Sequence, residues 1–163
     1  MGKKCENIKH KLILAIFYST GIRRSELLNI KLEDIDWTEN RIFIHSVKNC
    51  KNGYVQLHEL TKKYLLKYIK EWRPKEYLFN GQKTIRYSAS SVFNVVNDAS
   101  LGKYSPHDFR RTYLTNLIEK ENVFAAKDIA RHNSLKSTLH YYHIPKDKLK
   151  TMYNPMDEFL KVC

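Results

Sequence analysis

Residues 18–37 read YSTGIRRSELLNIKLEDIDW, and this stretch decides how the chain is laid out. The residues before it, 8–19, are predicted to form an apolar helix, because Thr20 and Gly21 supply a typical helix end. A second, short helix is expected to begin near Arg23 and to run through SELLNI. The sequence therefore predicts two consecutive helices joined by a turn.

Two short segments after this stretch, residues 41–46 and 54–58, predict a β-hairpin. Both are rich in β-branched or aromatic residues, and the basic loop VKNCKNG separates them. Further helical patterns are predicted at residues 88–98, 106–120, 123–131, 134–141 and 145–152, before a tail helix in PMDEFLKV. With no repeats and no linker, the predicted fold class is mainly α with a small antiparallel β-hairpin or sheet, in a single domain of residues 1–163.

The segment at residues 60–72 predicts a helix with one apolar face. Leu65, Ile69 and Trp72 fall on that face by three- and four-residue spacing, and lysines fall on the other. Pro74 ends the helix, because proline cannot continue the backbone hydrogen-bond ladder.

Length and composition exclude several classes of protein. Hydrophobic residues make up 42% of the 163 residues, which is enough for a conventional core. The longest apolar run, residues 12–18, is far shorter than the roughly 18–20 residues of a membrane span, and the start of the chain lacks a secretory signal. We therefore expect a cytoplasmic protein with no membrane partner. Cys5, Cys50 and Cys163 are widely spaced and are predicted to be free thiols.

The charge balance points to a polyanionic partner. The chain carries 29 lysines and arginines against 17 acidic residues, which gives a formal net charge of +12. Ribosomal proteins, nucleases, transcription factors and some membrane-surface proteins share this property. A basic surface that serves only solubility stays open as an alternative.

The stretch SPHDFRRTYLTNL has the pattern of a helix start beside a phosphate site. Ser105 is predicted as the N-cap, Pro106 suits the first helical position, and Asp108 completes a capping box. His107 and Arg110 then share one face near the helix N-terminus, whose N–H groups favour phosphate. Either the two side chains hold one phosphate together, or His107 assists the cap and Arg110 is solvated.

His132 and Tyr141 are nine residues apart, and one continuous helix would point them in opposite directions, at about 100° per residue. The polar pair Asn133 and Ser134 interrupts the helical pattern. If Ser134 caps a new helix, the histidine and the tyrosine can turn toward a common point, as a catalytic pair requires. Tyr142 would then face about 100° away.

These residues together resemble the tyrosine recombinase (phage integrase) family. The stretch TGIRRSEL is similar to the family motif T-G-[LI]-R-x-S-E-L, in which Arg23 matches the first catalytic arginine. His107 and Arg110 match the family's H-x-x-R, and His132 and Tyr141 match its second histidine and its nucleophilic tyrosine. The resemblance covers nearly the whole chain, and it implies the tyrosine recombinase catalytic-domain fold.

The resemblance also implies a catalytic lysine in the hairpin, which is Lys51, with Lys48 as the competitor. The sequence departs from the family pattern at two points. Arg131 stands where the family usually has glycine before the second histidine, and only about twenty residues precede the Arg23 motif. We therefore expect the N-terminal core-binding domain to be absent from this chain, as in an excised catalytic domain or a naturally truncated integrase.

The implied function is that of a site-specific DNA recombinase, an enzyme that cleaves and rejoins DNA through a 3′-phosphotyrosine. Two guanidiniums, from Arg23 and Arg110, suit the charge spread over a five-coordinate phosphorus. Tyr141 must lose its proton to attack, and His107 is a candidate to take it. The predicted catalytic residues are Arg23, Lys51, His107, Arg110, His132 and Tyr141.

Lys51 is the candidate general acid for the leaving 5′ oxygen, and His132 is expected to orient the phosphate. Because religation needs no nucleotide hydrolysis, no cofactor is expected, which fits the lack of a P-loop pattern. The acidic residues Glu33, Asp34 and Asp36 are predicted to decorate a turn and not to hold a metal, so cleavage is expected to be metal-independent.

The expected partners are double-stranded DNA and further copies of the chain, assembled on DNA as a tetramer. Two other functions remain open: a non-catalytic DNA-binding module of the same fold, and DNA relaxation of the type IB topoisomerase kind. Tyr18 and Tyr142 are expected to be packing residues. Additional DNA contacts are predicted at Arg24, Lys48, Arg111, Arg131 and Lys136.

Overall fold

The computed structural model describes residues 7–46, 51–81 and 85–142. In chain order the elements are α1 (Ile8–Thr20), α2 (Arg24–Asn29), the 3-10 helix η1 (Leu32–Asp34), β1 (Ile35–Asp36), β2 (Arg41–Ile44), β3 (Gly53–Gln56), α3 (Glu59–Trp72), α4 (Ala89–Ala99), α5 (Pro106–Lys120), α6 (Val123–Ile129) and α7 (Leu135–Leu139). The predicted class, mainly α with a small antiparallel sheet, is confirmed. The helices predicted at 145–152 and in the tail lie outside the described residues, as do Cys5, Cys50 and Cys163.

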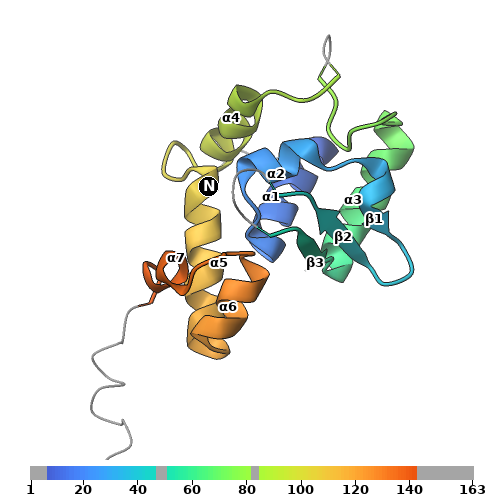
Figure 1. Ribbon diagram of the computed structural model, residues 1–163. Helices are drawn as coiled ribbons and strands as arrows, with labels where there is room; N and C mark the ends of the chain where they lie inside the picture. Colours follow the sequence, from blue (N-terminus) through green and yellow to red (C-terminus); the bar gives the residue numbers. More distant parts are fainter. Residues whose placement is uncertain (1–6, 47–50, 82–84, 143–163) are drawn as a thin grey trace, which may run out of the picture.

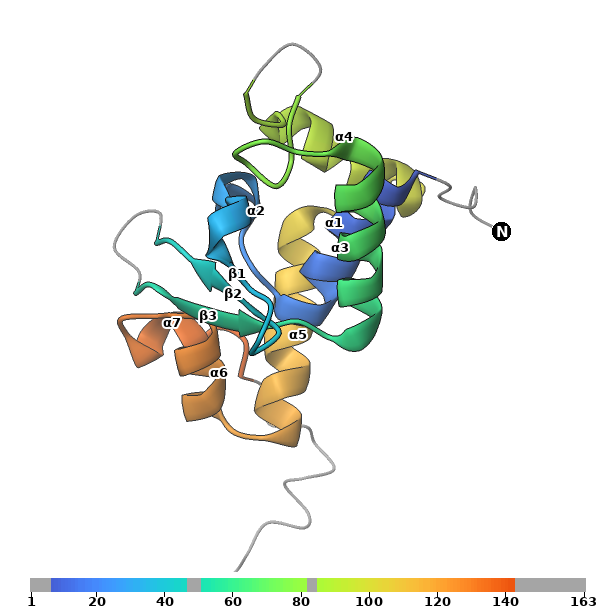
Figure 2. The ribbon, with the colours of Figure 1, turned by 90° about the vertical axis from the view of Figure 1, so that its right-hand side faces the viewer.

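Helix α1 lies at the centre of the fold. It runs between α3 and α5 and also contacts α4 (Figures 1 and 2). It begins after Asn7, whose side-chain oxygen accepts a hydrogen bond from the Lys9 N–H at 2.9 Å. The fully buried side chains of α1 include Leu12, Ile13, Ile16 and Phe17. An apolar helix at residues 8–19 was expected, and the structure confirms it.

The three strands form one antiparallel sheet in the order β1-β2-β3. Ile42 pairs with Val55 across the hairpin and with Ile35 of β1, and all three side chains are buried. The hairpin prediction is confirmed, whereas β1 was not predicted. At two residues β1 is too short to show the alternation by which strands are recognised.

Helix α3 buries the predicted face except at Trp72. Leu65 is fully buried and Ile69 is partly buried, as expected, but Trp72 is 46% exposed. Tyr68 is buried in its place, at 1% exposure. Trp72 stacks on Tyr68 with ring centroids 6.0 Å apart, and the Lys9 Nζ lies 4.1 Å from the centre of its ring. Trp72 thus covers the core edge and holds a lysine by a cation–π contact.

The acidic residues after α2 organise the backbone. Asp34 accepts from the Lys31 N–H at 2.8 Å and lies 2.7 Å from His45 Nε2. Asp36 accepts from the N–H groups of Thr38 and Glu39 and from Arg41 Nε. Among the residues that the structure describes, no three His, Cys, Asp or Glu side chains group together as metal ligands would. Within the same residues, no helix has the length and apolar character to span a membrane.

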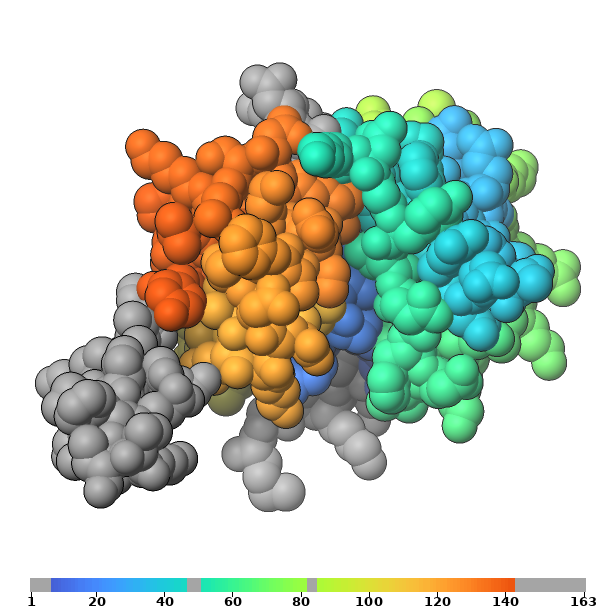
Figure 3. Space-filling model, turned by 60° about the horizontal axis from the view of Figure 1, so that its bottom comes forward, coloured from blue at the N-terminus to red at the C-terminus, as the bar shows by residue number. Residues whose placement is uncertain are grey.

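The last two described helices, α6 and α7, lie beside the hairpin (Figure 3). Helix α6 packs on α5 and on α7, and it also contacts β3. Figure 3 shows this junction from below, with α6 and α7 in orange beside the hairpin in teal. Arg131, which comes just before the predicted break at Asn133 and Ser134, accepts a hydrogen bond from the Lys51 N–H at 3.2 Å, at the loop end of the hairpin.

Candidate active site

Gly21 makes the turn that separates α1 from α2. Its φ of 60° lies in the left-handed region, and its N–H donates to the Phe17 carbonyl at 3.0 Å. A Cβ at this position would overlap the ring of Tyr113. Glycine is required here both by the backbone conformation and by the close approach of α5, and the turn delivers Arg23 to the start of α2.

Arg23 is held at the α2 N-terminus by the carboxylate of Glu26. The Arg23 N–H donates to Glu26 Oε2 at 2.7 Å, and its Nη1 donates to Oε1 at 2.8 Å. The Arg23 side chain keeps 27% of its surface exposed, whereas that of Glu26 is fully buried. The guanidinium is thus fixed at one end and open to an incoming anion.

The start of α5 is built as the sequence predicted. Pro106 is the first helical residue, and the Asp108 carboxylate accepts from both the Ser105 hydroxyl, at 2.7 Å, and the Ser105 N–H, at 2.8 Å. These bonds lower the pKa of Asp108 below its ordinary value. His107 is exposed in the first turn, beside the helix N-terminus.

Arg110 lies in the interior of the site and is 3% exposed. Its Nη1 donates to the Gly21 carbonyl at 2.7 Å, and its Nη2 donates to the Ala130 carbonyl at 3.0 Å. Burial, with the nearby charge of Arg23, lowers its pKa to about 10, so the guanidinium stays charged at neutral pH. The alternative interpretation of Arg110 as a solvated side chain is wrong.

His132 and Tyr141 meet across the break between α6 and α7. Helix α6 ends at Ile129, and Ser134 caps α7 by accepting from the Lys136 N–H at 3.2 Å. The rings of His132 and Tyr141 then lie nearly parallel, at 17°, with centroids 6.5 Å apart. The predicted interruption of the helix is confirmed, and it turns the tyrosine toward the histidine.

His132 contacts Arg110 directly. The Arg110 Nη2 lies 3.1 Å from His132 Nε2, and His132 Nδ1 lies 2.9 Å from the Thr138 hydroxyl. Because a guanidinium can only donate, Nε2 must accept, so the proton sits on Nδ1 and Thr138 accepts it. Burial and the charge of Arg110 lower the pKa of His132 to about 4. In this structure the neutral imidazole orients the arginine.

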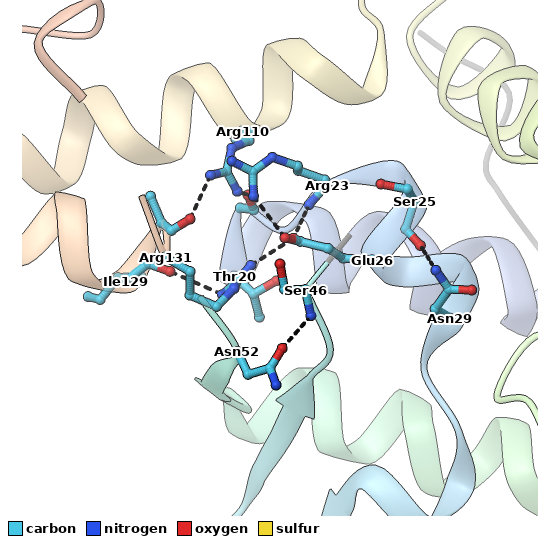
Figure 4. Close-up of polar contacts among 12 residues, drawn as sticks. Thr20, Arg23, Ser25, Glu26, Asn29, Ser46, Asn52, Arg110, Ile129 and Arg131 are labelled. Carbon is cyan, nitrogen blue, oxygen red and sulfur yellow. Dashed lines mark hydrogen bonds and ion pairs between the residues drawn. The ribbon is translucent and has the colours of Figure 1, made fainter. Parts of the chain in front are cut away.

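An open pocket of about 420 Å³ lies between the starts of α2 and α5. Arg23, His107 and Arg110 line it from the starts of α2 and α5, together with Arg24. Figure 4 shows the guanidiniums of Arg23 and Arg110 side by side above Glu26. The structure thus brings together five of the predicted catalytic residues, through this pocket and the contacts of His132 with Arg110 and Tyr141.

Lys51 contacts the site through its backbone N–H. Its side chain is exposed, and its N–H donates to the Arg131 carbonyl at 3.2 Å. Lys48, the competing lysine, lies outside the described residues. Arg24, Arg111 and Lys136, predicted to contact DNA, are all exposed.

Arg131 does not lie where a DNA contact requires. Its side chain is 3% exposed, and its Nη2 donates to Glu26 Oε2 at 2.7 Å. A buried guanidinium paired with a buried carboxylate is unavailable to a phosphate on the surface. Tyr18 and Tyr142 also depart from prediction, because they are 71% and 44% exposed.

The sequence reasoning missed three residues that build the site. Glu26 occupies the third position of α2, where a capping carboxylate is typical, and this was the available signal. Thr138 gave no signal, because its contact with His132 exists only once the break folds. Phe93 of α4 lines the pocket with Arg23 and is 41% exposed.

The sequence profile of the phage integrase family matches residues 1–148 of the 163-residue chain. The chain belongs to the phage integrase family. This integrase-family chain is 29% identical over 159 residues to the tyrosine recombinase XerC of Staphylococcus epidermidis, an alignment that covers 91% of the chain and 53% of that relative. It is 32% identical to the XerC of Anoxybacillus flavithermus, over 89% of the chain and 53% of the relative. The chain thus spans about half the length of these curated relatives.

Solved structures of integrase-family proteins share the fold. The crystal structure of XerA recombinase has a TM-score of 0.76 and 26% identity, over 91% of this chain and 57% of that one. The XerH site-specific recombinase bound to its difH substrate has a TM-score of 0.73 and 24% identity, over 88% and 45% of the two chains. The architecture of this integrase-family chain is therefore that of a tyrosine recombinase.

Proposed function

We propose that this chain is the catalytic domain of a site-specific DNA recombinase, which cleaves and rejoins double-stranded DNA through a 3′-phosphotyrosine at Tyr141. The observation that carries the proposal is one constellation: the guanidiniums of Arg23 and Arg110 meet at one pocket, and His132 links Arg110 to Tyr141. The four side chains come from separate segments, so the arrangement is a product of the fold. Family membership supports it, and XerH, which shares the fold, is a site-specific recombinase that was solved bound to its difH substrate.

The proposed chemistry begins with the scissile phosphate in the pocket between Arg23 and Arg110. Both guanidiniums stabilise the charge on the non-bridging oxygens, which grows as phosphorus becomes five-coordinate. The Tyr141 oxygen attacks phosphorus and loses its proton to His107. The bond to the 5′ oxygen breaks, and Lys51 gives that oxygen a proton. A second 5′-hydroxyl then reverses these steps and joins the new strand.

His132 has a supporting part in this scheme. Its Nε2 accepts from Arg110, and its ring lies beside Tyr141. A neutral imidazole adds no repulsion beside two guanidiniums, which agrees with its lowered pKa of about 4. His132 therefore sets the direction in which Arg110 points.

The proposed partners are double-stranded DNA and further protomers, arranged as a tetramer on DNA in the cytoplasm. The net charge of +12 supports binding to a polyanion. Arg24, Arg111 and Lys136 are exposed and remain candidates for phosphate contacts. Arg131 is not among them, because Glu26 occupies its guanidinium in the interior.

Covalent trapping tests the proposal. The full chain is incubated with nicked half-site duplexes from the flanks of the element that encodes it, with EDTA present. We expect a denaturant-resistant protein–DNA adduct that maps to Tyr141 by mass spectrometry. Tyr141→Phe should abolish it, and the matched control Tyr142→Phe should form it at the normal rate.

Three outcomes would contradict the proposal. An adduct at Tyr142 would assign the nucleophile to the neighbouring residue. DNA binding without any adduct would favour a non-catalytic binding module. Relaxation of a plasmid that lacks every candidate site would favour an activity of the type IB topoisomerase kind.

A further inference from the structure

Arg131 combines three unusual properties at one position. Its φ is 57°, in the left-handed region that favours glycine, and it stands where the family usually has glycine. Its side chain is 3% exposed, although arginine is rarely buried. It also directly precedes His132. A residue that keeps an unfavourable backbone and a buried charge must make contacts that offset both.

The contacts of Arg131 reach three segments of the site. Its Nη2 donates to Glu26 Oε2 of α2 at 2.7 Å, and its Nη1 donates to the Ile129 carbonyl at the end of α6 at 3.1 Å. Its carbonyl accepts the Lys51 N–H at 3.2 Å. Its side-chain stem packs on Gly53, where a Cβ would come within 3.2 Å of the Arg131 Cδ. Figure 4 shows the guanidinium turned inward to Glu26.

Glu26 is the point at which Arg131 meets the catalytic machinery. Its Oε2 accepts from both Arg131 Nη2 and the Arg23 N–H, and its Oε1 accepts from Arg23 Nη1. With one arginine alone, this carboxylate would cancel the charge of Arg23. The second guanidinium gives the three-residue group a net charge of +1, and Arg23 is the member with the more exposed side chain, 27% against 3% for Arg131.

The protonation of Glu26 agrees with this geometry. Burial disfavours its carboxylate, but the charges of Arg131 and Arg23, with the hydrogen bond from Arg23, hold its pKa below the ordinary value. Because Arg131 lies beside it, the buried carboxylate stays ionised. It therefore continues to accept the hydrogen bonds from Arg23.

We propose that Arg131 is a positioning residue for DNA cleavage: it holds Glu26, and through Glu26 the phosphate-binding guanidinium of Arg23, while its carbonyl fixes the backbone at Lys51. This inference rests on the proposed function. In this role Arg131 aligns Arg23 and Lys51 and does not itself contact DNA.

The first test compares Arg131→Gln with Arg131→Lys in the full chain. We expect Arg131→Gln to lower the adduct rate at saturating DNA by about tenfold to a hundredfold, because misplaced groups slow chemistry, with apparent Kd unchanged within about twofold. Arg131→Lys keeps the charge beside Glu26 and should stay within about threefold of wild type. The matched control Lys67→Gln removes one exposed charge from α3 and should leave both quantities unchanged.

Two results would overturn the inference. A raised Kd with an unchanged rate at saturation would assign Arg131 to DNA contact. Equal losses of adduct rate in Arg131→Gln and Arg131→Lys would show that the charge of Arg131 does not position Arg23. If Arg131→Gln fails to fold, Arg131→Gly takes its place, because glycine relaxes the left-handed backbone.

Amide hydrogen exchange gives a readout that does not depend on cleavage. In Arg131→Gln we expect the N–H groups of Arg23 and Lys51 to exchange about tenfold faster, and the sheet amide of Val55 to stay protected. Unchanged exchange at Arg23 and Lys51 would contradict the positioning role. If the wild-type chain forms no adduct, the proposed function fails, while this measurement still decides what Arg131 holds in place.

Discussion

The two arginines at the pocket are anchored in opposite ways. Arg110 is 3% exposed and is held by the carbonyls of Gly21 and Ala130 and by the neutral ring of His132. Arg23 is more open and is held by the carboxylate of Glu26. Neutral acceptors hold Arg110 without offsetting its positive charge. The carboxylate that holds Arg23 offsets part of the positive charge there.

Arg110 is therefore part of the core, whereas Arg23 lies at the edge of the pocket. Removing Arg110 would leave buried carbonyls without donors, so its function and the stability of the fold are inseparable. Arg23 depends on Glu26, whose carboxylate is itself shared with Arg131. Both of these supports are buried, whereas the Arg23 side chain that they hold keeps 27% of its surface exposed.

Arg110→Lys should change both stability and activity more than any other substitution considered below. A lysine lacks the planar fork with which Nη1 and Nη2 of Arg110 donate to the Gly21 and Ala130 carbonyls, so we expect the unfolding free energy to fall by about 2–4 kcal/mol. The rate of adduct formation should fall by about a thousandfold, because a preorganised donor pair is lost. Urea unfolding and covalent trapping measure the two quantities. Wild-type stability in this variant would show that Arg110 is not needed for the core.

Arg23→Lys should separate activity from stability. The adduct rate is expected to fall by about a hundredfold, because a lysine cannot hold Glu26 and a phosphate oxygen in the same fork. The unfolding free energy should change by only about 1 kcal/mol, since the side chain lies at the edge of the pocket. The same two assays apply. A stability loss equal to that of Arg110→Lys would show that both arginines belong to the core.

The weakest effect is a dependence of stability on pH, to which His132 beside Arg110 contributes. An unfolded histidine binds a proton near pH 6.5, whereas folded His132 stays neutral down to about pH 4. The unfolded state therefore binds more protons between these values, and stability is lost as pH falls. We expect the free energy of unfolding to fall by about 1–2 kcal/mol between pH 6.5 and 5. Chemical denaturation at each pH measures this change.

His132→Gln should flatten this slope, because its amide oxygen accepts from Arg110 without titrating. A residual slope is expected from His10, whose pKa burial also lowers. The exposed His140→Gln is the matched control and should keep the wild-type slope. An unchanged slope in His132→Gln would mean that the imidazole is not the neutral support of Arg110.

Local sequence was sufficient for most elements. Helix α5 begins at Pro106 and ends at Lys120, as predicted, because its capping box acts within four residues. The turn at Gly21 and the break before α7 were also predictable, since left-handed glycine and a serine cap are local properties. The prediction for Trp72 was wrong, because residue spacing identifies a helix face but does not identify the neighbour that covers each position of that face.

For the site, the residue types and their spacing were sufficient to predict, through the family resemblance, the chemistry proposed for Arg23, Arg110 and Tyr141. How these side chains are held depends on contacts between distant segments. The bond from Arg110 to Gly21 spans 89 residues, and the ion pair of Arg131 with Glu26 spans 105. Such contacts leave no local pattern, because the free energy that selects them comes from burial, and burial is settled only when distant segments pack together.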